Sequence, residues 1–197
     1  MPSPNLTASQ TARRERMLSV ALELADAGGW DAVQMREVAS GADVAIGTLY
    51  RYFPSKEHLL VSVMLQQIRE LSERMTQRPV RGPDGAQRVE AVLGRANKAL
   101  QGAPEVTKAM IKALVSGNTD VAPVVGMVRD EMSRLLSTAY RGVDGSEAPV
   151  ADESPADRLR IELLSDIWLA TLVSWICGTE DARAVQPRLA EAVSVLL

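Results

Sequence analysis

The apolar residues of this 197-residue chain recur three and four positions apart, and this spacing constrains the fold more than any other feature of the sequence. One example is the run Leu18, Ala21, Leu22 and Ala25, which lies on a single helical face and ends at Gly28. Glycine and proline clusters interrupt the pattern and divide the chain into about nine helices. Because no segment alternates apolar and polar residues between hairpin turns, the sequence predicts an all-α fold. The expected helices span residues 11–27, 35–40, 45–50, 55–77, 86–101, 105–115, 120–141, 155–177 and 181–196, and Thr11 is the expected cap of the first.

The charges are unevenly distributed along the chain. The sequence has 22 basic and 25 acidic side chains and a net charge of -3, so composition alone gives no reason to expect a nucleic-acid partner. Residues 1–56 nevertheless contain equal numbers of basic and acidic side chains, and the acidic excess lies in residues 57–197. Any affinity for DNA must therefore come from the local placement of a few cations and helix N-termini, and a dimer would present two such sets.

A single cysteine and a single histidine exclude an internal disulfide and a zinc site of the His/Cys type. We therefore expect no metal and no cofactor, and a reducing cytoplasm as the natural compartment. The longest apolar run, Ile167 to Cys177, has eleven residues, whereas about 20 are needed to span a bilayer. The first ten residues lack the apolar core of a signal peptide. The expectation is a cytoplasmic protein without a membrane segment.

Residues 35–50 contain two short helices joined by a three-residue turn at residues 41–43, and a longer helix precedes them. This is the anatomy of a helix-turn-helix DNA-binding domain, whose second helix enters the major groove. That helix combines small residues, which let the backbone approach a groove, with side chains that can meet bases or phosphates. Ile46, Leu49 and Phe53 should face inward and anchor it. The expected DNA-binding residues are Gln34, Arg36, Ala45, Gly47, Thr48, Tyr50, Arg51, Tyr52 and Lys56.

We place the DNA-binding domain at residues 1–56 and a larger helical domain for ligand binding and dimerisation at residues 57–197. Methionine and tryptophan at helical spacing suit a pocket for a large apolar effector, although such a stripe is also typical of plain core. The candidate effector-binding residues are Met110, Leu114, Met127, Met132, Trp168, Leu172 and Trp175, with Asn97, Asn118 and Thr119 as possible polar anchors. The last two helices are the candidate dimer interface, through Ala170, Val173, Ser174, Cys177, Leu189 and Val193.

The sequence contains no motif of an enzyme. It lacks a nucleophile elbow, a dinucleotide-binding glycine motif and a Walker loop. The adjacent acids Asp130 and Glu131 point apart on a helix and are expected on a solvated face. Short helix pairs also occur in many all-α folds, so a helical protein-interaction module that does not bind DNA is an alternative of a different class.

The segment from Thr48 to Leu60, preceded by Val38, Ala39 and Val44, strongly resembles the head of the TetR family of transcriptional regulators. The resemblance implies a homodimeric regulator that binds a palindromic operator through the helix-turn-helix and an effector through its larger domain. The chain departs from the family pattern at three positions. Asp43 replaces the usual glycine of the turn, Ala45 replaces a frequent serine cap, and Arg51 replaces a frequent histidine.

Parts of the second domain resemble one subgroup of this family, which represses genes of sterol (cholesterol) catabolism. The similar segments are residues 97–100, 107–110 and 165–169, together with Trp175. The resemblance implies a repressor that a steroid-like acyl-CoA releases from its operator. An alternative within the family is a regulator of other genes, for efflux or fatty-acid metabolism, with a different apolar ligand.

Overall fold

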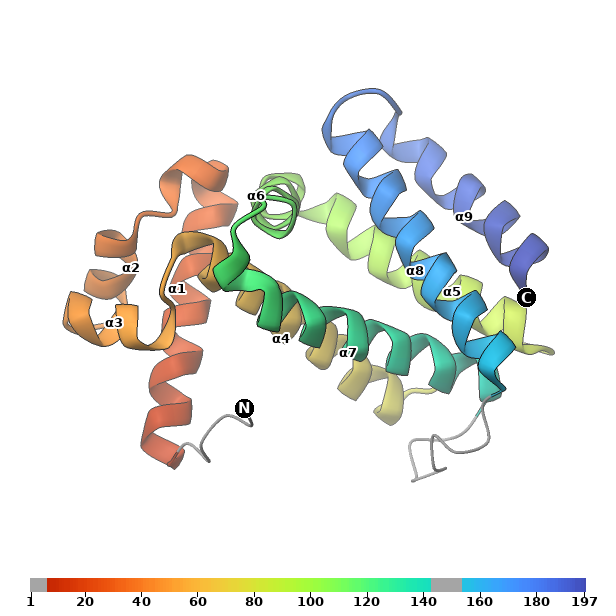
Figure 1. Ribbon diagram of the computed structural model, residues 1–197, viewed down its shortest axis with the longest axis horizontal. Helices are drawn as coiled ribbons and strands as arrows, with labels where there is room; N and C mark the ends of the chain where they lie inside the picture. The colour runs from red at the N-terminus through yellow and green to blue at the C-terminus, as the bar shows by residue number, and fades with distance from the viewer. Residues whose placement is uncertain (1–6, 143–153) are drawn as a thin grey trace. The chain divides into compact units, whose positions relative to one another are not determined.

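The computed structural model describes residues 7–142 and 154–197, and it confirms the all-α fold (Figure 1). Across these two ranges the chain forms helices and no strand. Each expected helix is present, with ends that differ by a few residues. The helices are α1 (Ala8–Ala32), α2 (Met35–Gly41), α3 (Ile46–Tyr52), α4 (Lys56–Gln77), α5 (Gly85–Gly102), α6 (Pro104–Leu114), α7 (Ala122–Arg141), α8 (Pro155–Ile176) and α9 (Ala182–Leu196), and a short 3-10 helix (Thr119–Val121) precedes α7.

The first helix begins earlier than expected. Thr7, and not Thr11, is the N-cap, because its side chain accepts a hydrogen bond from the Gln10 backbone while the Gln10 side chain accepts one from the Thr7 backbone. At the other end, Gly28 and Gly29 leave the helical conformation, and Gly29 has a φ of 63°. The expected break at these glycines is therefore present, although one helical turn follows it.

The chain folds into two compact units. The first comprises Met1–Gln66 together with Ala103–Val125, and the second comprises Gln67–Gly102 together with Gly126–Leu197. Helix α4 thus begins in the first unit and ends in the second. The domain boundary after residue 56 stays a prediction.

In the first unit, α1 packs against α6 and α2, and α2 packs against α3. Leu49 and Phe53 are completely buried, as expected, and Met17 and Val38 of the same unit are completely buried as well. The expectation that Ile46 faces inward is wrong, because its side chain is 40% exposed. Helix α3 has seven residues and buries only Leu49 along its length, so its first residue extends past the packed part.

In the second unit, α9 packs against α5 and α8. This packing buries Leu189 and Val193 completely or nearly so, at 0% and 2% exposure. Their assignment to a dimer interface is therefore wrong, because the subunit itself covers them. The inward face of an apolar helix and its outward face have the same composition, so the sequence did not distinguish the two.

Arg88 links α5 to the end of α7 within the second unit. Its guanidinium donates hydrogen bonds to the carbonyl oxygens of Ala139 at 2.8 Å, Tyr140 at 2.7 Å and Gly82 at 3.1 Å. Gly85 lets the two helices approach closely, since a β-carbon there would lie 2.6 Å from the Tyr140 carbonyl oxygen. The last carbonyls of α7 therefore have a cationic partner, which also suits the helix dipole.

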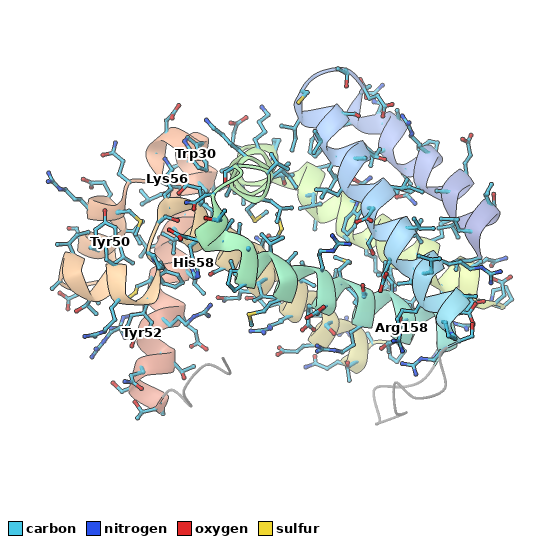
Figure 2. The ribbon with its side chains drawn as sticks, in the orientation of Figure 1. Trp30, Tyr50, Tyr52, Lys56, His58 and Arg158 are labelled. Atoms are coloured by element: carbon cyan, nitrogen blue, oxygen red, sulfur yellow. The ribbon has the colours of Figure 1, made fainter. Side chains whose placement is uncertain are left out.

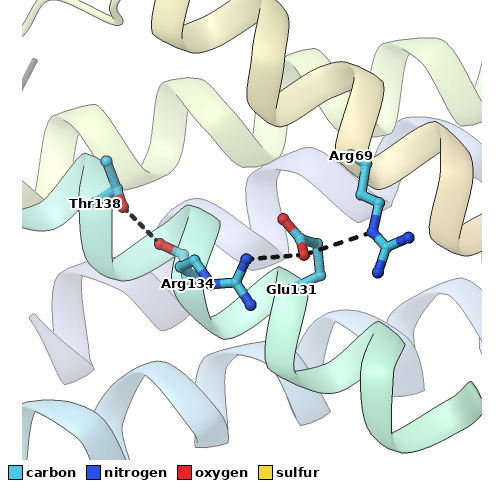
Figure 3. Close-up of polar contacts among 4 residues, drawn as sticks. All are labelled: Arg69, Glu131, Arg134 and Thr138. Carbon is cyan, nitrogen blue, oxygen red and sulfur yellow. Dashed lines mark hydrogen bonds and ion pairs between the residues drawn. The ribbon is translucent and has the colours of Figure 1, made fainter. Parts of the chain in front are cut away.

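Glu131 links α4 to α7 within the second unit (Figure 3). Its carboxylate lies 3.8 Å from the Arg69 Nε and 3.0 Å from the Arg134 Nη1, and its side chain is only 9% exposed. The expectation that Glu131 belongs to a solvated face is therefore wrong. The buried carboxylate is accompanied by two guanidinium groups, which is the condition under which such a charge is tolerated.

Candidate functional site

The helix-turn-helix is formed by α2, a tight turn and α3. Asp43 adopts a left-handed backbone conformation with a φ of 53°, so it performs the conformational role of the usual glycine at some steric cost. The backbone N–H of Val44 donates to the Ala39 carbonyl at 3.0 Å and closes the turn. Ala45 is the N-cap of α3 and supplies no side-chain hydrogen bond, as expected from its replacement of serine.

The predicted DNA-binding residues lie at the surface of the first unit. Tyr50 is 48% exposed, and Tyr52 is half-buried (Figure 2). Gln34 is the exposed N-cap of α2. The other exposed members of the set are Arg36, Ala45, Gly47 and Arg51, whereas Thr48 and Lys56 are half-buried. The exposed residues of α3 and its N-cap are therefore two small ones, Ala45 and Gly47, the apolar Ile46, the aromatic Tyr50 and the cationic Arg51. All of them are accessible to a DNA groove.

Helix α4 begins with a serine cap next to the helix-turn-helix. Ser55 Oγ accepts a hydrogen bond from the His58 backbone N–H at 3.1 Å. The Lys56 ammonium lies 4.3 Å from the centre of the Trp30 ring, a contact that sequence reasoning missed because the two residues are far apart in the chain. Partial burial lowers the pKa of Lys56; the carboxylates of Asp31 and Glu57 oppose this shift, and Lys112 adds to it.

His58 lies in the first turn of α4, beside the ring of Phe53. Burial lowers its pKa below 6.5, the positive charge of Arg14 lowers it further, and Asp120 opposes the shift.

The lowered pKa of His58 makes the stability depend on pH. As the pH falls below about 6.5, the unfolded chain binds a proton that the folded chain does not, so the free energy of unfolding decreases. We expect His58→Gln to reduce the loss of stability between pH 7 and pH 5, measured by denaturant unfolding at both values. Equal losses in the variant and the wild type would contradict this.

The predicted effector-binding residues are divided between the two units. Met110 and Leu114 belong to the first unit and the other five to the second. Trp168, Leu172 and Met132 are buried at 6%, 4% and 7% exposure, and Trp175 is half-buried. Met127 is 40% exposed, so it does not line a closed interior. One pocket in the second unit, of about 70 Å³, is lined by none of the predicted residues, and ligand pockets have volumes of about 300–1,000 Å³.

Two of the residues singled out in the second unit have buried polar atoms without a hydrogen-bond partner in the described ranges. These atoms are Asn97 Oδ1 on α5 and Trp168 Nε1 on α8. Both side chains belong to residues that are less than a tenth exposed. A buried donor or acceptor of this kind normally has a partner, so each requires an explanation.

The remaining candidates for the dimer interface lie on the outside of α8. Ala170 and Cys177 are exposed, and Val173 and Ser174 are partly exposed. Sequence reasoning missed Leu159 and Leu163, which are 56% and 43% exposed. The spacing of Leu159, Leu163, Ala170 and Cys177 places all four on one helical face. This stripe, which we call the α8 outer face, is exposed in the subunit, and it also carries the Asp166 carboxylate, which is paired with Arg129 at 3.4 Å.

Together, the two short helices, the left-handed turn and the exposed surface of α3 define a helix-turn-helix DNA-binding regulator. The family model for bacterial regulatory proteins of the tetR family matches residues 17–63, and the model for the tetracyclin repressor-like C-terminal domain matches residues 82–196. The chain belongs to the TetR family of transcriptional regulators, and it is not an enzyme. Among the described residues, no helix is long and apolar enough to cross a membrane.

Similar proteins extend over almost the whole chain. The HTH-type transcriptional repressor KstR of Rhodococcus jostii is 38% identical over 190 residues, which cover 96% of this chain and 84% of that protein. A crystal structure of a TetR transcriptional regulator from Rhodococcus sp. RHA1 has a TM-score of 0.83 at 34% identity and covers 96% of this chain and 97% of its own. The Thermus thermophilus repressor FadR, crystallised with lauroyl-CoA, shares the fold with a TM-score of 0.70 at 19% identity and covers 93% of this chain and 92% of its own.

The exposed side chain of Ile46 predicts a contact with thymine. An apolar side chain on the outer surface of a recognition helix can pack against the 5-methyl group of that base. We expect replacement of one thymine per half-site by deoxyuridine to weaken operator binding by about 15-fold, since burying one methyl group is worth roughly 0.8 kcal/mol and the dimer makes two such contacts. Fluorescence anisotropy with labelled duplexes measures the change. The Ile46→Ala variant should be insensitive to the same replacement, and equal sensitivity in both proteins would contradict the contact.

Proposed function

We propose that the protein represses genes of sterol catabolism as a cytoplasmic homodimer, and that a steroid-derived acyl-CoA thioester releases it from a palindromic operator. The family and the similarity to KstR over nearly the whole chain support the regulatory part of this proposal. The observation that carries the effector is the pair of unpartnered polar atoms, Asn97 Oδ1 and Trp168 Nε1, in a largely aliphatic interior.

The chemistry of these two atoms restricts the ligand. Each unpaired buried polar group costs about 1–3 kcal/mol, and a ligand that supplies its partner recovers that free energy. The indole N–H of Trp168 is a donor only, and the carbonyl oxygen of Asn97 is an acceptor only. A steroid nucleus offers a large apolar body and one or two polar atoms: a hydroxyl group can donate to Asn97 Oδ1, and a hydroxyl or keto oxygen can accept from the Trp168 N–H. The steroid part of the proposed thioester therefore suits an interior with few polar groups, and the charged coenzyme A part is expected to stay outside it.

Release from DNA follows from a difference in affinity between two states of the dimer. An effector that binds more tightly to a state with unsuitable spacing of the recognition helices shifts the population toward that state. Helix α4 is the proposed lever, because it begins with Lys56 in the first unit and ends at Gln77 in the second. Effector binding in the second unit can then alter the position of the first turn of α4.

Native mass spectrometry tests the proposal directly. The purified protein is titrated with a sterol-derived acyl-CoA, with lauroyl-CoA and with coenzyme A alone, and each compound is then added to the operator complex. We expect the sterol-derived thioester to bind one per subunit and to release the DNA. Trp168→Phe keeps an aromatic ring but removes the N–H together with the five-membered ring, so it should weaken effector binding by about fivefold or more while operator affinity stays within twofold.

A second candidate is a regulator of fatty-acid genes. It is favoured by the shared fold with the FadR that was crystallised with lauroyl-CoA. The same titration separates the two candidates. Release by lauroyl-CoA, without binding of the sterol-derived thioester, would replace the sterol proposal by this one.

A further inference from the structure

Trp30 carries two lysine ammonium groups from different helices. Lys56 Nζ of α4 lies 4.3 Å from the ring centre, and Lys112 Nζ of α6 lies 4.7 Å from it. Both distances fall inside the range of about 6 Å for a cation–π interaction, and tryptophan is the most favourable ring for it. Trp30 and Lys56 are drawn side by side in Figure 2. All three residues belong to the first unit.

The position of the Trp30 ring follows from the two glycines before it. Gly28 and Gly29 break the helical conformation of α1, and Gly29 has a φ of 63° that a side chain would strain. Gly29 also lies against α6, since a β-carbon there would be 3.1 Å from the Glu105 carboxylate. The chain therefore turns close to α6 and carries Trp30 to both lysines.

The contact restricts a side chain that is otherwise mobile. A free lysine loses up to about 2 kcal/mol of rotamer freedom when a phosphate fixes it, so a lysine that is already held loses less on binding DNA. Asp31 and Glu57 also attract the Lys56 ammonium. The aromatic ring adds a fixed surface for the four-carbon stem and one side of the ammonium, and it leaves the other N–H groups available for phosphate oxygens.

We propose that Trp30 is a positioning residue for operator binding, which holds Lys56 at the start of α4 ready for a DNA phosphate and links it, through Lys112, to α6. The proposal rests on the predicted phosphate contact of Lys56. It goes beyond that contact in two ways. The strength of the Lys56–phosphate contact depends on a ring outside the helix-turn-helix, and α6 affects the same contact through Lys112.

A double-mutant cycle on Trp30 and Lys56 tests the positioning role. The operator is a duplex selected from a randomised library, and its affinity is measured by fluorescence anisotropy at several salt concentrations. We expect Trp30→Leu to weaken binding by about fivefold or more, because a dimer contains two such contacts of about 0.5–1 kcal/mol each. Trp30→Phe keeps an aromatic face and should stay within twofold of the wild type. In a Lys56→Met background, which keeps an apolar stem, Trp30→Leu should change the affinity by less than twofold.

The outcomes separate a positioning role from a structural one. An equal loss from Trp30→Leu in the presence and absence of Lys56 would overturn the proposal, because the ring would then act through the fold. No loss from Lys56→Met alone would also overturn it, since there would be no contact to position. Neither result alters the effector titration, which measures release from DNA by a ligand and does not depend on Trp30.

The two lysines of α6 provide a matched pair for the second half of the proposal. Lys112 contacts the Trp30 ring, whereas Lys108 is paired with Glu105 at 2.7 Å. Each substitution by methionine removes one positive charge from the same helix. We expect Lys112→Met to weaken operator binding at least twofold more than Lys108→Met does, and this excess should disappear in the Trp30→Leu background. Equal effects of the two substitutions, or an excess that persists without Trp30, would overturn the link to α6.

Discussion

Ala170→Arg should convert the dimer into a monomer and lower operator affinity on the order of 100-fold, because two half-sites bound together gain greatly from effective concentration. Ala170 lies on the α8 outer face with Leu159, Leu163 and Cys177, and its small side chain permits close helix contact. An arginine there adds bulk and a positive charge where a partner helix must approach closely. Sedimentation velocity gives the oligomeric state, and fluorescence anisotropy gives the affinity.

Ala99→Arg is the matched control, since Ala99 is an exposed alanine on α5 and lies outside α8 and α9. This variant should stay dimeric and bind the operator with wild-type affinity. A dimeric Ala170→Arg protein would contradict the assignment of the α8 outer face to the interface. If Ala170→Arg is monomeric but binds the operator with wild-type affinity, then binding does not require two linked DNA-binding domains.

Phe53→Ala should lower the free energy of unfolding by about 3–5 kcal/mol, the usual cost of removing a buried phenylalanine side chain. Phe53 is completely buried, and its ring lies 6.0 Å from the His58 ring and 5.5 Å from the Arg14 guanidinium carbon. Phe53 follows directly after α3, so the cavity that its removal leaves disturbs the packing that supports the recognition helix. We expect operator binding to be lost at temperatures where the wild type is fully folded, as measured by denaturant unfolding and anisotropy.

Tyr50→Ala provides the contrast on the same helix. Tyr50 is 48% exposed, so its removal should change the free energy of unfolding by less than about 0.5 kcal/mol. Operator affinity should nevertheless fall by about tenfold, because the ring and hydroxyl are predicted to contact DNA. Similar destabilisation by both substitutions would contradict the assignment of Phe53 to the core and Tyr50 to the interface.

The helices and the helix-turn-helix were predictable because local signals define them. The turn between α2 and α3 was expected at residues 41–43, where Asp43 adopts the left-handed conformation, and the serine at position 55 marks the start of α4. The start of α1 was also present in the sequence but was misassigned. Thr7 is followed three residues later by Gln10, whose side chain can complete a capping box, whereas Thr11 is followed at that spacing by Arg14.

Features that depend on tertiary packing were not predictable in the same way. Leu189 and Val193 have the composition of an interface and of a core alike, and only the packing of α9 against α5 and α8 decides between them. Ile46 has core spacing relative to Leu49, yet α3 is too short to bury it. Trp30 meets Lys56 and Lys112 because of the fold of the first unit, and no local pattern connects these three residues.

Selection of a binding site from a randomised DNA duplex library tests the central claim most directly, namely that this chain is a dimeric, sequence-specific DNA-binding regulator. We expect enrichment of a two-fold symmetric sequence whose half-sites lie one helical turn, or a multiple of it, apart. Binding to the enriched site should weaken with salt, and Lys56→Ala should reduce that salt dependence. Failure to enrich any sequence, or enrichment of an asymmetric site bound equally well by the Ala170→Arg monomer, would contradict it.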